Sequence, residues 1–207
     1  MQVVRNDPNR VLESLREIPT GKDAYYAIRN INPRSLSRPE IAARFIYLNR
    51  FCFNGLYRTN LRGMFNVPYG PPKGKLSIDE LAVMNASRAL QSATLMHADF
   101  AETLADAREG DFVYLDPPYI VATRRVFSEY QPSSFTEKDL DRLGNLLHDL
   151  DARRVHFLVT YADSHEARSL LKAWSPRRAR IRRNIAGFAG SRRFSYELIA
   201  TNQPEGE

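Results

Sequence analysis

The order of apolar and polar positions along the chain predicts an alternation of helices and short strands. Apolar residues at helical spacing predict helices that begin at Val11, Pro39, Ile78, Thr136 and Ser164. Short apolar runs predict strands over residues 2–9 (ending in a turn), 94–100, 112–115, 155–161, 179–185 and 194–201. Strands that alternate with helices are typical of an α/β protein.

Two of these helices carry further expectations. The helix that begins at Pro39 is expected to be largely buried, because Ile41, Phe45 and Leu48 recur at helical spacing. Thr136 is expected to cap the later helix, with Asp139 as an imperfect capping-box partner. The helix over residues 78–90 is expected to pack on the sheet.

One strand runs directly into Asp116, Pro117, Pro118 and Tyr119. Residues 112–115 contain no glycine and predict a fully buried strand, which the prolines end at Asp116 because they cannot donate ladder hydrogen bonds. Ligands bind at the carboxyl ends of strands in open α/β sheets. A carboxylate and a rigidly held carbonyl can accept both hydrogens of a nucleobase amine, and Tyr119 offers a flat face. The alternative is an ordinary turn, since Asp-Pro is a common turn signal.

The net charge of +6 is spread unevenly over the 207 residues. Residues 1–75 carry 13 Lys/Arg against 5 Asp/Glu, residues 76–169 carry 9 against 16, and residues 170–207 carry 8 against 3. Between Arg29 and Lys75 the only acid is Glu40. Two basic segments predict a polyanion as partner, because each neutralised phosphate releases counterions. A generally basic protein with a random patch is the alternative.

Size and residue usage limit the remaining classes. The length predicts one sizeable domain with room for a smaller insertion. One cysteine, Cys52, excludes an internal disulfide framework and favours a reducing cytoplasm. The four histidines and Cys52 lack metal-ligand spacing, so we expect no metal. No apolar run is long enough to span a membrane, and no N-terminal signal pattern is present.

Residues 49–70 interleave aromatic residues with asparagines, glycines and arginines. Arginine can bind guanine edges and asparagine adenine edges, and both hold phosphates, so this composition suits a nucleic-acid surface. A glycine-rich structural hairpin is the alternative; it explains the aromatic residues better than it explains Asn54 and Arg58 together. The polar residues 120–134, next to the candidate site, predict a mobile lid.

Three features, taken in order and spacing, resemble Dam-type DNA adenine N6-methyltransferases: residues 49–70, the Asp99-Phe100 pair and the stretch from Asp116 to Tyr119. The resemblance covers nearly the whole chain. It implies a Rossmann-like sheet with helices on both faces and an inserted DNA-recognition subdomain. Residues 1–28 would begin the methyltransferase core, residues 29–75 would form the insertion, and residues 76–207 would complete the core.

The resemblance also implies the chemistry. S-adenosylmethionine would donate the methyl group to N6 of an adenine flipped out of duplex DNA, commonly in GATC. Direct in-line transfer would need no covalent enzyme intermediate. The implied catalytic residues are Asp116, Pro117, Pro118 and Tyr119. The implied cofactor-binding residues are Asp7, Asp99, Phe100 and Asp116. The implied DNA-binding residues are Asn54, Gly55, Leu56, Arg58, Asn60, Arg62 and Pro68.

The chain also departs from this family. Members begin with a glycine-rich Phe-x-Gly loop after a first strand, whereas this sequence starts at what resembles the second strand. Either the chain is a fragment of a longer protein, or a separate N-terminal segment completes the sheet; a rearranged sheet is the further alternative. We therefore expect weak binding of S-adenosylmethionine by this chain alone, and otherwise a monomer. An inactive DNA-binding remnant is the main alternative. Methyltransferases acting on RNA amines or protein glutamine typically have Asn in place of Asp116. A partner restriction enzyme, as in restriction-modification systems, is left open.

Overall fold

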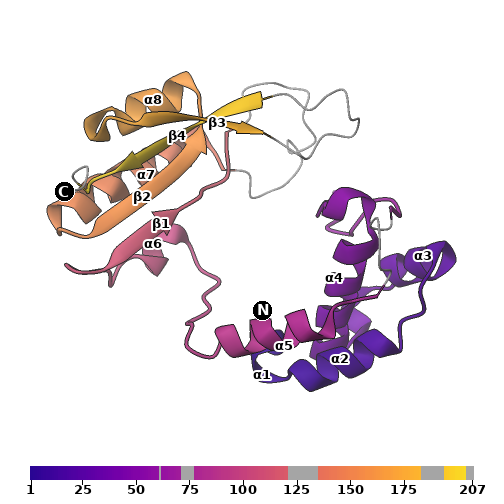
Figure 1. The fold of residues 1–207 in the computed structure, drawn as a ribbon. Helices are drawn as coiled ribbons and strands as arrows, with labels where there is room; N and C mark the ends of the chain where they lie inside the picture. The colour runs from indigo at the N-terminus through magenta and orange to yellow at the C-terminus, as the bar shows by residue number, and fades with distance from the viewer. Residues whose placement is uncertain (61, 71–76, 121–134, 183–193, 204–207) are drawn as a thin grey trace. The chain divides into compact units, whose positions relative to one another are not determined.

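The computed structural model describes residues 1–60, 62–70, 77–120, 135–182 and 194–203. The chain forms two compact units, Met1–His97 and Ala98–Glu207. Figure 1 shows the first unit from indigo to magenta and the second from pink to yellow. Each unit has its own hydrophobic core and is described by itself.

The first unit is helical. Its helices are α1 (Gln2–Asn6), α2 (Pro8–Arg16), α3 (Lys22–Asn30), η1 (Pro33–Ser35), α4 (Arg38–Phe51), η2 (Phe53–Gly55) and α5 (Glu80–Ala89). Val11, Tyr25, Tyr47 and Phe51 are almost completely buried at its centre. The Tyr25 hydroxyl donates to the Val67 carbonyl at 2.9 Å. Burial raises the pKa of Tyr25, so this hydroxyl stays protonated and joins α3 to the loop that follows α4.

The strand expected over residues 2–9 is absent; α1 and α2 occupy this segment. Asp7 caps α2 by accepting from the Arg10 amide at 3.4 Å, and Pro8 takes the first helical position, where its missing N–H costs nothing. Val4 is buried against the helical core. Tertiary packing therefore overrides the strand propensity of the valines.

Helix α4 begins at a complete capping box, in which Ser37 and Glu40 bond each other's backbone amides. Its buried residues include Tyr47, Leu48 and Phe51. Ile41 and Phe45, expected to be buried, are 41% and 53% exposed. The apolar positions surround this helix, so spacing alone could not identify the packed face.

Helix α5, expected to pack on the sheet, instead packs against α1 and α2 within the first unit. Its N-cap, Asp79, accepts from the Ala82 amide at 3.0 Å. Because α5 belongs to a separate helical core, the pattern over residues 78–90 predicted the helix correctly but not the surface that it covers.

The second unit contains a four-stranded sheet. Its elements are α6 (Phe100–Thr103), β1 (Phe112–Leu115), α7 (Glu137–Ala152), β2 (His156–Ala162), α8 (His165–Leu171), η3 (Lys172–Trp174), β3 (Arg177–Arg182) and β4 (Phe194–Thr201). The strand order is β1-β2-β4-β3. Strands β1 and β2 are parallel and connected through α7, whereas β4 runs antiparallel to both β2 and β3.

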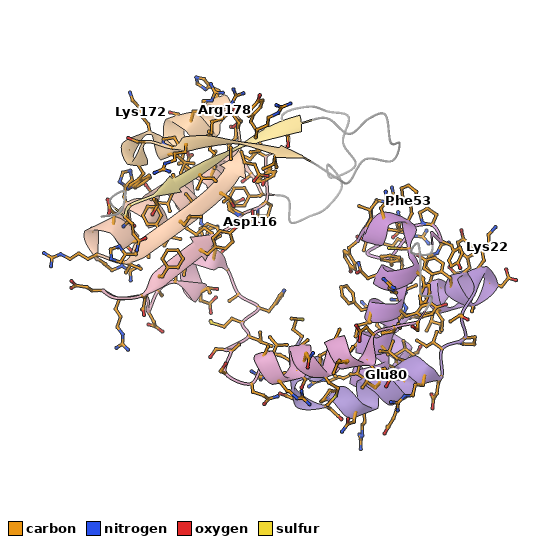
Figure 2. The ribbon with its side chains drawn as sticks, viewed as in Figure 1. Lys22, Phe53, Glu80, Asp116, Lys172 and Arg178 are labelled. Carbon is orange, nitrogen blue, oxygen red and sulfur yellow. The ribbon has the colours of Figure 1, made fainter. Side chains whose placement is uncertain are left out.

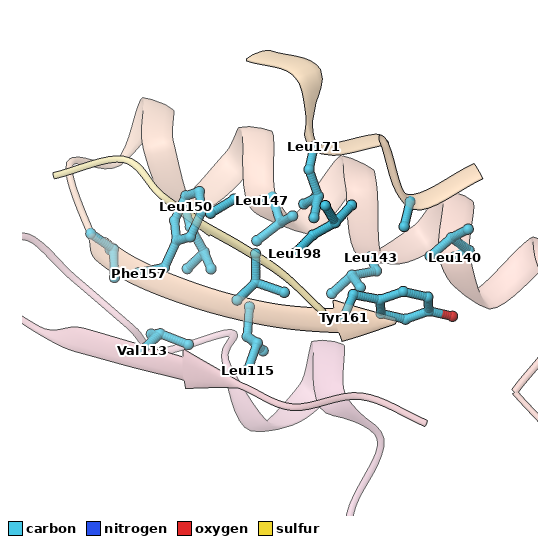
Figure 3. Packing of buried hydrophobic residues seen from close by; sticks show 14 residues of the cluster. Val113, Leu115, Leu140, Leu143, Leu147, Leu150, Phe157, Tyr161, Leu171 and Leu198 are labelled. Carbon is cyan, nitrogen blue, oxygen red and sulfur yellow. The ribbon is translucent and has the colours of Figure 1, made fainter. Parts of the chain in front are cut away.

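Leucines of α7 and apolar residues of the sheet form the core of this unit (Figure 3). Leu147, Leu150 and Phe157 are completely buried. The predicted cap is confirmed, with Thr136 and Asp139 forming a reciprocal capping box. Helices α7 and α8 pack on β2 and β4. The mixed α/β class is therefore confirmed, while the Rossmann-like arrangement, helices on the second face and the inserted subdomain stay predictions.

Two strand expectations fail in this unit. Strand β1 alternates in burial, with Phe112 and Tyr114 57% and 60% exposed, because the core formed by the described residues packs on the face that bears Val113 and Leu115. Residues 94–97 form no strand, and Asp99 instead caps α6 by accepting from the Ala101 amide at 3.0 Å. The predicted strands around residues 155–161 and 194–201 are confirmed as β2 and β4, and β3 covers the described part of the strand predicted over 179–185.

Within the described ranges, no helix has the length and apolar character needed to cross a membrane. The same residues contain no cluster of three or more His, Cys, Asp or Glu side chains arranged to hold a metal ion. The predicted lid over residues 120–134 lies, apart from Ile120, outside the described residues.

Candidate active site

Asp116 follows the last residue of β1, and Pro117 and Pro118 come directly after it. Because β1 and β2 are parallel, their carboxyl ends meet at the same edge of the sheet. The Asp116 side chain is exposed there (Figure 2). The strand, the acid and the prolines therefore occur in the predicted order.

A chain of hydroxyl groups orients Asp116. The Thr160 hydroxyl on β2 donates to Asp116 Oδ1 at 3.3 Å, and the Tyr114 hydroxyl lies 3.3 Å from the same Thr160 oxygen. Thr160 has only one hydroxyl hydrogen, so its bond to the carboxylate makes Tyr114 the donor to Thr160. This arrangement engages Oδ1 and leaves Oδ2 able to accept from a substrate.

Tyr119 is held at both its hydroxyl and its ring. The hydroxyl donates to Glu197 Oε1 on β4 at 3.0 Å, and the ring packs at 5.2 Å and 63° against Tyr161. The backbone amide of Ile120 donates to the Tyr161 hydroxyl at 3.0 Å. Burial raises the pKa of Tyr161, so this hydroxyl stays neutral while it accepts. Contacts with β2 and β4 thus fix the segment after the prolines.

Asp99 and Phe100 lie at the start of α6 and share one neighbour. Arg142 of α7 contacts Asp99 Oδ1 at 2.6 Å, and its guanidinium carbon lies 4.8 Å from the centre of the Phe100 ring. The Ala101 amide also donates to Oδ1. Both contacts use the same oxygen, which leaves Oδ2 able to accept a further hydrogen bond. Phe100 and Tyr119 border the same core cluster of the second unit.

The residues expected to bind DNA lie in the first unit, as does Asp7. The described residues between Cys52 and Gly70 form a hairpin, with antiparallel bridges Cys52–Tyr69 and Thr59–Phe65. Asn54 has φ 55°, so the chain turns through a left-handed conformation that asparagine tolerates. The predicted DNA-binding side chains on this hairpin are exposed except Leu56, which is half-buried; the exposed ones are Asn54, Arg58, Asn60, Arg62 and Pro68.

Some of these side chains also shape the hairpin. Arg58 Nε donates to Asn66 Oδ1 at 2.8 Å, and Asn60 Oδ1 accepts from the amides of Arg62 and Met64, each at 3.0 Å. Asn60 therefore closes the turn at the tip. The glycine-rich hairpin considered from the sequence is present, and its surface still presents two arginines.

Sequence reasoning missed four residues that support the site: Tyr114, Thr160, Tyr161 and Glu197. The strand predicted over 155–161 already contained Thr160 and Tyr161, and its alternation places them on opposite faces. Thr160 is 44 residues from Asp116, and Glu197 is 78 residues from Tyr119. Only the register of the sheet brings these pairs together.

The fold and the site together define an α/β protein whose candidate centre lies at the carboxyl edge of a mixed sheet. A family model described as D12 class N6 adenine-specific DNA methyltransferase matches residues 1–184. The chain belongs to this family.

Named relatives agree with this assignment. The chain is 31% identical over 208 residues to Type II methyltransferase M1.LlaDCHI of Lactococcus lactis subsp. cremoris, with 96% of the chain and 73% of the relative covered. It is 33% identical over 174 residues to Type II methyltransferase M.MjaIII of Methanocaldococcus jannaschii, covering 77% and 60%. It is 31% identical over 183 residues to DNA adenine methylase of Escherichia coli strain K12, covering 88% and 66%. The chain thus spans between 60% and 73% of the length of these three relatives.

Proposed function

We propose that the protein transfers a methyl group from S-adenosylmethionine to N6 of an adenine in duplex DNA. The observation that carries this proposal is the orientation of Asp116, with Oδ1 bonded to Thr160 and two prolines following. The free Oδ2 and the Pro117 carbonyl would accept the two amine hydrogens. Tyr119, fixed by Glu197 and Tyr161, would stack on the base.

The adenine amine is a poor nucleophile, because its lone pair is delocalised into the ring. Two acceptors at fixed positions would orient the amine and favour a more pyramidal nitrogen, which makes the lone pair available. N6 of a paired adenine cannot be reached inside the duplex, so the base would be flipped into the site. The residues of this chain thus bind and orient the nucleophile.

S-adenosylmethionine supplies a methyl sulfonium that is already activated for transfer. Within the second unit, Asp99 fits its adenine end, because Oδ2 can accept from an exocyclic amine while Arg142 and the Ala101 amide hold Oδ1. The Phe100 ring would pack on the same adenine. Asp7 lies in the first unit, where it caps α2 instead of ending a strand, so its role at the ribose hydroxyls stays a prediction.

DNA would be recognised by the hairpin of residues 52–70. Its exposed Arg58 and Arg62, together with Asn54 in the left-handed turn, present the donors that bind base edges and phosphates. We propose GATC as the target sequence, by resemblance to Dam-type enzymes.

The test is methyl transfer from radiolabelled S-adenosylmethionine to two duplexes. One contains a single GATC site, and in the other the adenine of that site is replaced by another base. We expect N6-methyladenine in the GATC duplex alone, identified by nucleoside analysis. Transfer at another adenine would reject GATC but keep the chemistry. DNA binding without transfer would support the inactive DNA-binding alternative, and transfer to cytosine would reject the proposed reaction.

The hydroxyl of Thr160 is expected to matter for turnover rather than for DNA binding. Thr160→Val keeps the shape but removes the bond to Asp116, so kcat should fall by about tenfold to a hundredfold through misorientation of the carboxylate. KM for DNA should stay within about twofold of the unmodified protein. Thr160→Ser, which restores a hydroxyl, should recover most of the lost kcat. Equal kcat in the valine and unmodified proteins would exclude the positioning role.

A further inference from the structure

Positive charge in the second unit is concentrated in one segment. Residues 98–166 carry 14 acidic and 7 basic side chains, whereas residues 167–196 carry 9 Lys/Arg and no Asp or Glu. The described part of this basic segment comprises α8 from Ala167 onward, η3, β3 and the start of β4. Within the part of the second unit that the structure describes, this segment supplies a basic surface that does not include the hairpin proposed to recognise DNA.

Three cations of this segment border one pocket. Arg168 on α8, Lys172 at the start of η3 and Arg178 on β3 line a surface pocket of about 610 Å³. Ser175, Pro176 and Leu198 also line it, and none of the lining side chains in the described part of the chain is a carboxylate. Figure 2 labels Lys172 and Arg178 on this unit. Guanidinium, ammonium and hydroxyl donors around an open pocket suit a phosphate group.

A buried carboxylate holds two of these cations in place. Asp163, whose side chain is 5% exposed, accepts from Arg168 Nε at 2.6 Å and from Arg178 Nε at 2.6 Å. The Arg178 guanidinium also lies 3.6 Å from the centre of the Tyr196 ring. The single negative charge of Asp163 does not balance the three positive charges of Arg168, Lys172 and Arg178, so the pocket lining keeps an excess of positive charge. The guanidinium groups are already ordered, so binding an anion costs little side-chain entropy.

This surface lies on the helix-covered face of the sheet, opposite to the face of Asp116 and Thr160, and reaches the same sheet edge through β3 and β4. Strand β2 ends at Ala162 opposite Glu197, but β3 and β4 continue to pair beyond that point through Arg180 and Tyr196. The β3–β4 pair therefore extends past the sheet edge where Asp116 lies. Three strand spacings of about 4.8 Å place β3 about 14 Å from β1, which is about four base-pair steps of DNA at about 3.4 Å each.

We propose that Arg168, Lys172 and Arg178 around this pocket, together with Arg180 on β3, bind backbone phosphates of duplex DNA beside the target base. The proposal rests on the proposed function in taking DNA as the partner. These contacts would be independent of sequence, because phosphates carry no base information. They would supplement the hairpin of the first unit.

Two structural roles could account for the same charges. Charged side chains on an edge strand such as β3 discourage pairing with other chains. A lysine after a helix, such as Lys172, interacts favourably with the helix dipole. Neither role changes DNA affinity, so a binding measurement separates them from the proposal.

The test is the double variant Lys172→Gln/Arg180→Gln, assayed by fluorescence anisotropy with a labelled duplex over a range of salt concentrations. Arg168 and Arg178 are left intact because they also neutralise buried Asp163. Losing two phosphate contacts should reduce the magnitude of the slope of log affinity against log salt by about 1.8. The ratio of the affinity at about 50 mM salt to the affinity at about 200 mM salt should therefore be about tenfold smaller in the double variant than in the unmodified protein. The loss should be the same with and without GATC in the duplex.

Arg154→Gln is the matched control, because Arg154 precedes β2 at the opposite end of the sheet and pairs with Glu109 at 3.6 Å. Its salt slope should equal that of the unmodified protein. An unchanged slope in the double variant, or an equal change in the control, would overturn the proposal, as would a loss confined to GATC duplexes. The anisotropy measurement reports DNA binding and does not depend on methyl transfer. If the proposed function were wrong, the unmodified protein would show no transfer in the methylation assay, whatever the outcome of the binding measurement.

Discussion

Asp116→Ala is expected to abolish methyl transfer while leaving most DNA affinity. The alanine removes the acceptor that we propose orients the amine and also the partner of Thr160, so the rate should fall by at least about 10³-fold. Affinity for duplex DNA should stay within about threefold, because phosphate contacts supply most of it. Single-turnover transfer and equilibrium anisotropy on the same duplex measure the two effects separately.

Asp111→Ala is the matched control for this change. Asp111 precedes β1 at the end opposite to Asp116 and accepts from the Arg108 amide at 2.9 Å. Its replacement by alanine therefore removes a carboxylate that is remote from the site. The control should retain transfer. Substantial transfer by Asp116→Ala would refute the role given to that carboxylate. A parallel loss of DNA affinity in Asp116→Ala alone would instead indicate that the side chain acts in binding.

Gly70→Ala is expected to disrupt the hairpin that we propose recognises DNA. A Cβ at Gly70 would lie 2.6 Å from the Phe53 Cα and 3.0 Å from its nitrogen, and neither backbone atom can move without separating the two segments. Phe53 and Gly70 also donate backbone hydrogen bonds across the stem, to Pro68 and Phe51, each at 2.9 Å. We expect a local destabilisation of about 3 kcal/mol or more and loss of preference for the target sequence.

Hydrogen exchange of the amides in residues 52–70 measures the first effect, and competition between GATC and unrelated duplexes measures the second. Gly63→Ala is the control within the same hairpin. Gly63 has φ 72° and open space around the added Cβ, so only backbone strain of about 1 kcal/mol is expected. Protection in Gly70→Ala equal to that in Gly63→Ala would contradict the steric role of Gly70.

The sequence predicted those features that depend on neighbouring residues. The end of β1 before Asp116 follows from the two prolines, and the cap of α7 follows from Thr136 and Asp139, three positions apart. Both rest on local chemistry, since proline lacks an N–H and a threonine oxygen reaches the amide three residues on.

The two wrong strands share one cause. An apolar run followed by an aspartate predicts a strand ending in an acid, but Asp7 and Asp99 both cap helices that begin at the next residue. Aspartate favours N-cap positions as strongly as strand-end turns, so the residue alone does not choose between them. The exposure of Phe45 and Tyr114 has a different origin: periodicity identifies apolar positions, but not which of them another element covers.

The supporting side chains of the site were beyond sequence reasoning for a third reason. Thr160 reaches Asp116 only through the parallel register of β1 and β2, and Glu197 reaches Tyr119 from β4. Register depends on the packing of whole faces, which no single motif encodes.

Strand β4 has a consequence for the evolution of this site. Its adjacent residues Tyr196 and Glu197 point to opposite faces, one beneath Arg178 and the other to the Tyr119 hydroxyl. An insertion or deletion of one residue in this strand would exchange the two faces. The hydrogen bond that holds Tyr119, the proposed stacking partner of the base, and the ordered cations would then be lost together. Length changes here should therefore be tolerated far less than substitutions.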